Sequence, residues 1–167
     1  WKNDNVPRMW SRLQAKVKSL HPDWEYRLWT DKENRTFVEQ EFPEFIETYD
    51  GLAKNIMRAD VIRYLIMYKL GGLYLDLDYE MLKPFDLIDH DIVLPYSRNV
   101  ELGDSSDMVG NCIFASAPGH DFWRIVIDDL TENPPKRDNP DVEKSTGPAY
   151  LTRIFHEVCR DSGICIH

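Results

Sequence analysis

Cysteines are few in this sequence of 167 residues, and they form no recognisable pair. The three are Cys112, Cys159 and Cys165, so their number is odd and no CxxC motif is present. An odd count without that motif argues against a disulfide framework and against a thiolate metal site. We therefore expect these residues to be buried or free thiols.

Long apolar runs and an excess of positive charge are also missing. No stretch approaches the roughly 20 consecutive apolar residues that cross a membrane as a helix, so no membrane span is expected. The chain has 20 lysines and arginines against 29 aspartates and glutamates, a net charge of -9. Nucleic-acid-binding domains are typically basic, so a nucleic-acid partner is disfavoured. An acidic protein can still bind an anionic substrate when a divalent cation bridges the two.

The composition that is present is that of a globular domain. Hydrophobic residues make up 43% of the chain and charged residues 29%. The length fits one domain that can build its own core. The chain starts at Trp1 and not at a methionine, so we expect it to be a piece of a longer protein.

Apolar residues recur along the chain with a helical period in some segments and a strand period in others. The helical spacing predicts helices over 9–20, 55–70, 121–130 and 149–159, with shorter ones after Thr30 and after Pro43. Alternating or short apolar runs predict strands over 24–29, 73–75, 79–82, 91–94 and 108–115. Strands that alternate with helices indicate an α/β fold with a mixed, mostly parallel sheet flanked by helices.

The stretch from Gly71 to Asp78 has the sequence GGLYLDLD and joins the longest predicted helix to a strand. Glycine is typical of a helix end, and the apolar run that follows predicts a buried strand. Asp76 and Asp78 would then lie two apart at the end of the strand, with their side chains pointing the same way. Open α/β sheets bind ligands at that edge. Two converging carboxylates suit Mg²⁺ or Mn²⁺.

Three charged residues interrupt the apolar helix predicted over 55–70: Arg58, Asp60 and Arg63. Asp60 and Arg63 are three apart and therefore neighbours on one helix face. On a solvated stripe such an ion pair would add at most roughly a few tenths of a kcal/mol. Alternatively, the pair faces the same cleft as Asp76 and Asp78, because this helix runs directly into their strand. The sequence leaves both interpretations open.

Phosphatases of the haloacid dehalogenase type also place two aspartates after a strand, the first as nucleophile and the second as general acid. In those enzymes the motif usually opens the domain and is followed by Gly-Thr or a similar pair. Here the two aspartates lie in mid-chain and are followed by Tyr79 and Glu80. The phosphatase interpretation is therefore the weaker one.

The joined helix and strand motif resembles the sugar-binding region of the DXD glycosyltransferases of family 32. The resemblance rests on RADVIRY at residues 58–64 and on GGLYLDLD at residues 71–78. Further similarities lie in 21–31, at Asn111 with 117–120, and in 146–148, so that most of residues 1–155 are covered. The family includes fungal α-1,6-mannosyltransferases, sphingolipid mannosyltransferases and bacterial capsule enzymes.

The resemblance implies a fold and a reaction. The fold would be a single GT-A-type, Rossmann-like domain over residues 1–167, truncated at both ends and lacking its first strand. The reaction would be the metal-dependent transfer of a hexose from GDP-mannose or a UDP-hexose to a glycan, lipid or polysaccharide acceptor, with retention of configuration. An inactive module that binds nucleotide sugars or glycans is the alternative. The location would be cytoplasmic in a bacterium, or the Golgi lumen in a eukaryote with an anchor outside this chain.

The resemblance also implies roles for individual residues. Asp78 would bind Mn²⁺ or Mg²⁺ directly, and Asp76 would contact the metal, the ribose or the donor sugar. Asp60 and Arg63 would bind the hexose hydroxyls and the phosphate side of the donor. Asn111 would lie near the acceptor or the anomeric carbon.

Other candidate residues lie outside this group. Trp1 would stack on the nucleobase, and Arg58 would either contact the donor or serve the structure. His156 and His167 are candidates for further metal ligands, although a lone histidine is more often structural or exposed. Acceptor contacts are expected from the polar segments 98–107 and 133–143, since loops vary freely on a fixed scaffold.

Overall fold

The computed structural model describes residues 1–3, 5–85, 90–97 and 108–162. Its central sheet has the strand order β1-β5-β2, with β1 at Gly72–Leu75, β5 at Ile113–Ser116 and β2 at Ile92–Val93. A second, two-stranded sheet pairs β3 (Tyr96–Ser97) with β4 (Met108–Val109). The register of the central pair aligns Gly72 with Ser116 and Leu75 with Ile113.

Every pairing between these strands is antiparallel, so the prediction of a mostly parallel sheet is wrong for the described strands. The alternation of helices and strands along the chain suggested that successive strands are parallel neighbours. The strand that pairs with β1 is instead β5, which comes much later in the sequence and runs antiparallel to it. The segments 24–29 and 79–82, which were predicted to be strands, are irregular. The strand predicted over 108–115 is divided into β4 and β5 by a bend at residues 110–112.

A parallel hydrogen-bond pattern does occur where the chain begins. The backbone nitrogen of Trp1 donates to the carbonyl of Trp29 over 2.7 Å, and the amide of Asp31 donates to the carbonyl of Trp1 over 2.8 Å. The two bonds flank Thr30 on either side, as successive bonds do in a parallel pair. Residue 1 therefore runs alongside the end of the extended segment 24–30.

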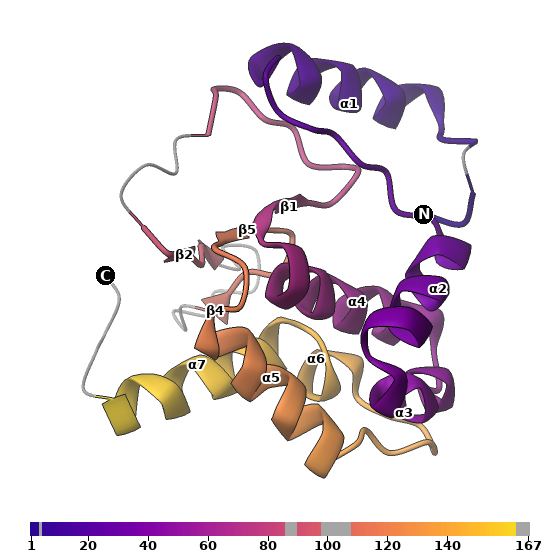
Figure 1. Ribbon diagram of the computed structural model, residues 1–167, viewed down its shortest axis with the longest axis vertical. Helices are drawn as coiled ribbons and strands as arrows, with labels where there is room; N and C mark the ends of the chain where they lie inside the picture. Colours follow the sequence, from indigo (N-terminus) through magenta and orange to yellow (C-terminus); the bar gives the residue numbers. More distant parts are fainter. Residues whose placement is uncertain (4, 86–89, 98–107, 163–167) are drawn as a thin grey trace.

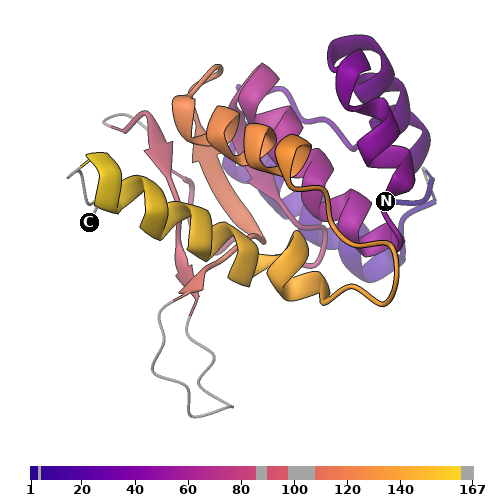
Figure 2. The same cartoon turned by 90° about the horizontal axis from the view of Figure 1, so that it is seen from below.

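The helices follow the predicted order closely. They are α1 (Arg8–Leu20), α2 (Asp31–Glu41), α3 (Ile46–Gly51), α4 (Asn55–Leu70), α5 (Asp121–Glu132), α6 (Val142–Ser145) and α7 (Pro148–Ser162), with a 3₁₀ turn at Pro43–Phe45. Helices α4, α5 and α7 lie on one side of the central sheet and α1 lies on the other (Figure 1). Seen from below, α5 and α7 run across the strands (Figure 2).

Helix α2 begins directly after Thr30, as the sequence predicted, and Thr30 caps it. The side chain of Thr30 accepts a hydrogen bond from the amide of Glu33, and the carboxylate of Glu33 accepts one from the amide of Thr30 over 2.9 Å. This reciprocal capping box satisfies two amides that would otherwise have no helical partner. It fixes the start of α2 beside Trp1.

The core beneath the central sheet is an aromatic cluster. Tyr64 of α4, Phe114 of β5 and Trp123 of α5 are fully buried. The rings of Tyr64 and Trp123 stack with centroids 5.8 Å apart, and those of Phe114 and Trp123 lie 4.9 Å apart. Aromatic pairs at these separations add to the gain from area burial. The cluster locks α4, α5 and β5 together below the carboxyl end of β1.

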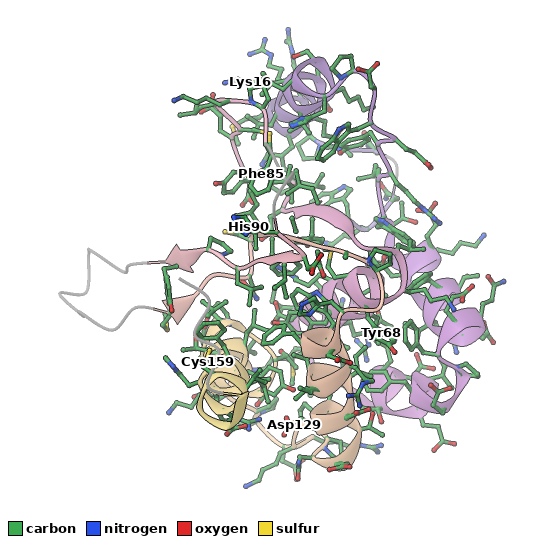
Figure 3. All side chains as sticks on the ribbon, turned by 60° about the vertical axis from the view of Figure 1, so that its left-hand side comes forward. Lys16, Tyr68, Phe85, His90, Asp129 and Cys159 are labelled. Carbon is green, nitrogen blue, oxygen red and sulfur yellow. The ribbon has the colours of Figure 1, made fainter. Side chains whose placement is uncertain are left out.

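Helix α1 is the least integrated of the long helices, since none of its residues is buried. Lys16 forms an ion pair with Glu80 over 2.9 Å, and the amide of Phe85 donates to Nε2 of His21 over 2.8 Å. Figure 3 shows Lys16 and Phe85 on this side of the molecule. Across the described residues, no helix combines the length and apolar character that a membrane crossing requires.

The turn between α4 and β1 depends on Gly71. Its backbone has φ 64° and ψ -155°, a region that is open essentially to glycine alone. A Cβ atom at this position would lie 2.6 Å from the backbone nitrogen of Pro118 and 2.7 Å from the carbonyl oxygen of Ser116. The close approach of the 116–118 backbone therefore sets the angle at which α4 meets the strand.

We expect Gly71→Ala to lower the free energy of unfolding by roughly 2–4 kcal/mol, because backbone strain and a steric clash add together. The matched control is Gly72→Ala. Gly72 also has a positive φ, of 91°, but a Cβ atom there would meet nothing within 4 Å. We expect the control to cost roughly 1–2 kcal/mol. Urea unfolding of both variants measures the difference, and equal losses would contradict the clash.

Candidate functional site

The guanidinium of Arg63 is the centre of the site, and it is only 4% exposed. Its Nε donates to the carbonyl of Ala59 over 2.9 Å, and its Nη1 lies 3.2 Å from Oδ1 of Asp76. Its Nη2 lies 3.3 Å from Oδ1 of Asp60. A further hydrogen bond runs from Nη1 to the carbonyl of Asn111. One buried cation therefore joins α4 to the end of β1 and to the bend before β5.

Asp60 is equally buried, at 4% exposure. Its carboxylate accepts one hydrogen bond from Nδ2 of Asn111 over 3.0 Å and another from the hydroxyl of Thr146 over 3.0 Å. Burial raises the pKa of Asp60 to about 6, although Arg63 and the Thr146 hydrogen bond act in the opposite direction. The interpretation of Asp60 and Arg63 as a pair on a solvated stripe is therefore wrong. Both face the interior beside Asp76.

Asp76 closes the cluster from the strand side. Its Oδ1 accepts a hydrogen bond from the hydroxyl of Tyr74 over 2.7 Å, in addition to its contact with Arg63. Its side chain is 30% exposed, so one edge of the carboxylate reaches the surface. Burial raises the pKa of Tyr74 above its ordinary value, which keeps the phenol protonated as a donor. The ring of Tyr74 also lies 5.0 Å from the guanidinium carbon of Arg63.

The sequence predicted that Asp76 and Asp78 share one face of a strand. In the structure they do not. Strand β1 ends at Leu75, and the amide of Tyr79 donates to the carbonyl of Asp76 over 3.1 Å to close a turn over 76–79. Asp78 is exposed on this turn. The geometry therefore divides the pair into one carboxylate held by Arg63 and Tyr74 and one that faces solvent.

The carboxylate oxygens of this site suit a loosely held divalent cation. They do not form a complete coordination shell among the described residues. Among the described residues, no group of three or more histidine, cysteine or acidic side chains is arranged to hold a metal. Mg²⁺ is usually bound through one or two carboxylates together with phosphate oxygens and water. Asp78 offers an exposed carboxylate and Asp76 a partly exposed one, both within the turn over 76–79. A cation here would need a phosphate ligand to complete its coordination.

Thr146 is a member of the site that the sequence did not reveal. It is fully buried, and its hydroxyl donates to Asp60 across 86 positions of sequence. Its carbonyl accepts a hydrogen bond from the hydroxyl of Tyr64 over 2.7 Å. Its hydroxyl therefore joins the segment before α7 to the buried face of α4. The sequence feature that pointed to Thr146 was the similarity of residues 146–148 to the family. That similarity alone assigns no role to the residue.

The remaining candidates lie outside this cluster. Arg58 donates from Nη2 to the carbonyls of Asp50 and Leu52, at 3.0 and 2.7 Å, so its guanidinium holds the connection before α4. The ring of Trp1 makes an edge contact with Trp10 at 4.7 Å. His156 is exposed on α7. His167 and the segment 98–107 lie outside the described residues.

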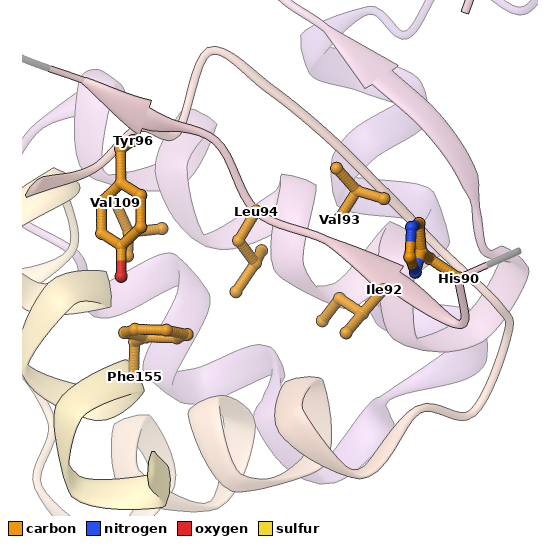
Figure 4. A pocket seen from close by; sticks show the side chains of 7 residues that line it. All are labelled: His90, Ile92, Val93, Leu94, Tyr96, Val109 and Phe155. Atoms are coloured by element: carbon orange, nitrogen blue, oxygen red, sulfur yellow. The ribbon is translucent and has the colours of Figure 1, made fainter. Parts of the chain in front are cut away.

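A separate apolar cavity of about 170 Å³ lies between the strand segment 92–96 and α7. Figure 4 shows Ile92 and Leu94 beside it, with Tyr96 opposite Phe155. The described residues that line it carry neither a carboxylate nor a guanidinium. Its lining therefore offers little to a charged donor, and the polar cluster around Arg63 remains the candidate site.

Comparison with known proteins places this cluster within a defined sequence region. Residues 7–95, just over half of the chain, match the family described as "Glycosyltransferase sugar-binding region containing DXD motif". The chain belongs to this glycosyltransferase family. The resemblance inferred from RADVIRY and GGLYLDLD is thereby confirmed. The matched range contains Asp60, Arg63, Asp76 and Asp78, whereas Asn111 and Thr146 lie beyond it.

Two curated relatives extend the similarity along nearly the whole chain. Inositol phosphoceramide mannosyltransferase 3 of Schizosaccharomyces pombe is 38% identical over 157 residues, which cover 93% of this chain and 42% of the relative. A mannosyl phosphorylinositol ceramide synthase of Saccharomyces cerevisiae is 32% identical over 164 residues, which cover 96% of this chain and 42% of the relative. The chain thus spans less than half the length of these relatives.

A solved structure shares the fold. The PaToxG glycosyltransferase superposes with a TM-score of 0.65 at 16% sequence identity, covering 98% of this chain and 69% of that one. The mixed α/β fold of a glycosyltransferase is therefore confirmed. At this identity the comparison concerns the fold alone.

The raised pKa of Asp60 predicts a pH-dependent stability. Its folded pKa of about 6 exceeds the ordinary value of 3.8 for an aspartate, so protonation of Asp60 favours the folded state. The stabilisation is complete below about pH 4 and is lost as the pH rises through about 6. Relative to Asp60→Asn, we expect the wild type to lose up to about 3 kcal/mol of unfolding free energy between pH 4 and pH 7.

Urea unfolding at several pH values measures this difference. Asp121→Asn is the control, because its side chain is 82% exposed, and we expect its stability to follow the wild type at every pH. Parallel curves for the wild type and Asp60→Asn would contradict the assignment.

Proposed function

We propose that this chain forms the donor-binding part of a glycosyltransferase that moves mannose from a nucleotide-diphosphate sugar to an inositol-phosphate glycolipid. The observation that carries the proposal is the buried cluster of Asp60, Arg63 and Asp76 with the exposed Asp78 at its edge. It lies in the sugar-binding region of the family. The 38% identity to an inositol phosphoceramide mannosyltransferase supports mannose and a glycolipid acceptor.

In this proposal Asp60 and Arg63 hold the hexose. A carboxylate accepts hydrogen bonds from two adjacent sugar hydroxyls, and a guanidinium donates to oxygens on the other side of the ring. Both groups are held rigidly, because Asn111 and Thr146 fix Asp60 while Asp76 fixes Arg63. Rigid placement supplies much of the rate acceleration in a group transfer. Asn111 sits where the bend before β5 would meet the acceptor.

Asp78 and the outer edge of Asp76 face the diphosphate in this arrangement. They would hold Mn²⁺ or Mg²⁺ together with phosphate oxygens, and such a cation offsets the charge that develops on a departing diphosphate. The positive charge of Arg63 adds to the same effect from the protein side. Tyr74 keeps Asp76 oriented through its 2.7 Å hydrogen bond.

The proposal includes two finer points. Residues 1–167 form one GT-A domain, and transfer retains the anomeric configuration. The parallel hydrogen-bond pattern around Thr30 supports the first point, since GT-A sheets contain parallel strands. The family resemblance supports the second. A same-face displacement would need no second nucleophile behind the sugar.

Replacing Asp78 by Asn tests the proposal directly. We expect the rate of mannose transfer from a nucleotide-diphosphate mannose to inositol phosphoceramide, with Mn²⁺ present, to fall at least about a hundredfold. The reason is that removal of one preorganised electrostatic contact at the reacting group typically costs that much. The matched control is Glu80→Gln, two positions along the same turn region, whose carboxylate pairs with Lys16. We expect the control to retain transfer within about threefold.

The rate is measured by product formation with a radiolabelled sugar donor. Transfer that persists in Asp78→Asn would refute the role of this carboxylate. Binding of the donor without any transfer by the wild-type protein would favour the inactive binding module.

A further inference from the structure

Helix α1 carries a concentration of positive charge in an acidic chain. Its 13 residues include four basic side chains and no acidic one: Arg8, Arg12, Lys16 and Lys18. The chain as a whole has a net charge of -9. The helix is the outermost element at its end of the molecule, away from α5 and α7 (Figure 1). A basic amphipathic helix at the surface of an acidic domain indicates a negatively charged partner.

Three of these basic residues form one row. Arg8, Arg12 and Lys16 are spaced by four, so they follow one another along a single face of the helix. Arg8 and Arg12 are exposed, and in the part of the chain that the structure describes neither forms an ion pair. The side chain of Lys16 is 38% exposed and pairs with Glu80. Two cations of the row are therefore available to an external partner.

Exposed apolar side chains lie beside the row. Met9 is three positions before Arg12 and therefore on the same side of the helix. Leu82 lies in the neighbouring segment, which is fastened to α1 because Glu80 pairs with Lys16 and the amide of Phe85 donates to the C-cap residue of the helix. Leu82 and Met9, at 73% and 68%, are the most exposed large hydrophobic residues among those described.

Together these side chains form a surface that we call the basic α1 surface. Its members are Arg8, Met9, Arg12, Lys16, Leu82 and Lys83, the last of which is also exposed. Large apolar side chains that remain exposed next to one another mark interaction sites. Helices that bind at a membrane interface combine cations at the lipid headgroups with apolar side chains that enter the boundary below them. The basic α1 surface offers both kinds of group.

We propose that the basic α1 surface docks this domain on an anionic lipid membrane and so presents the 76–79 turn to acceptors in that membrane. The inference rests on the proposed function, because it takes the acceptor to be a glycolipid. A lipid surface is favoured over an acidic protein because such an acceptor is itself anchored in a bilayer. Negative headgroup charge and hydrocarbon next to it match the cations and the apolar side chains in one partner.

The distance between this surface and the candidate site agrees with the assignment. Asp78 is exposed on the 76–79 turn, and Glu80, which pairs with Lys16, comes two residues later. Two residues of extended chain span at most roughly 7 Å. The headgroup of a glycolipid would therefore reach the carboxylate of Asp78 while its hydrocarbon chains stay in the membrane.

Co-sedimentation of the purified protein with lipid vesicles tests the docking. The vesicles consist of phosphatidylcholine alone or with about 30% phosphatidylserine, an anionic lipid that attracts basic segments. We expect binding to the anionic vesicles only, and its loss in about 1 M salt, where screening limits charge interactions to about 3 Å. Combining Arg8→Gln with Arg12→Gln should weaken binding roughly 25-fold, since each basic residue near such a surface contributes roughly fivefold.

Two further variants separate the surface from total charge. Arg124→Gln combined with Lys144→Gln removes the same charge from α5 and α6, at the opposite end of the molecule (Figure 1). Their side chains are 52% and 79% exposed, and we expect this control to bind as the wild type does. Leu82→Ser should weaken binding to anionic vesicles but leave its dependence on salt unchanged, because it removes an apolar contact and no charge.

Transfer assays connect the docking with the reaction. With the acceptor glycolipid in anionic vesicles, we expect the combined Arg8→Gln and Arg12→Gln variant to raise the KM for the acceptor in proportion to the lost vesicle binding. The kcat should stay unchanged, since neither arginine belongs to the cluster around Arg63. With the same acceptor in neutral detergent micelles, the variant and the wild type should transfer mannose equally.

The possible results separate this inference from the proposed function. Equal binding of the wild type to neutral and anionic vesicles, binding to neither, or full binding by the arginine variant overturns the docking. Transfer that depends on Asp78 in detergent leaves the proposed function in place in all three cases. Salt-sensitive vesicle binding that the arginine variant loses supports the docking. If the wild type then transfers no mannose in either setting, the proposed function is overturned and the lipid-binding surface is retained.

Discussion

The buried guanidinium of Arg63 is the interaction on which the arrangement of this chain depends. A charge in the interior is tolerated only when partners compensate for the lost hydration. Those partners come from three places: Asp60 on the same helix, Asp76 at the end of β1 and the carbonyl of Asn111 in the bend before β5. Each must be in position for the others to be satisfied. The aromatic cluster below, with Trp123 at its centre, supplies the apolar support for that arrangement.

Local sequence patterns were sufficient to predict α4, β1 and the glycine turn between them. The apolar period of 55–70 and the two glycines are short-range signals, and the structure has the helix at Asn55–Leu70 and the strand at Gly72–Leu75. The same stretch nominated Asp60, Arg63 and Asp76, which the structure brings together. Their roles in binding a donor remain proposals. The geometry adds what the sequence left open, namely that the pair on α4 faces inward.

The features that escaped prediction depend on contacts between distant segments. Strand direction was wrong because β1 pairs with β5, about 40 positions later in the chain by register, and no local period encodes that choice. The 76–79 turn was missed because Asp76 and Asp78 were assumed to continue the strand. Thr146 was missed because its partner is 86 positions away. A hydroxyl beside a helix start is most simply interpreted as a cap, and only the fold shows another use.

The hydrogen bond from Thr146 to Asp60 also has a consequence for how the chain is made. Asp60 leaves the ribosome 86 residues before its last donor. At roughly 5–20 residues per second, that delay is roughly 4–17 s. During this interval the carboxylate has Arg63 and then Asn111 available as partners but lacks the hydroxyl of Thr146, so its burial is not yet fully compensated. The sugar-binding cluster is therefore completed late in synthesis, after the first half of the fold has already emerged.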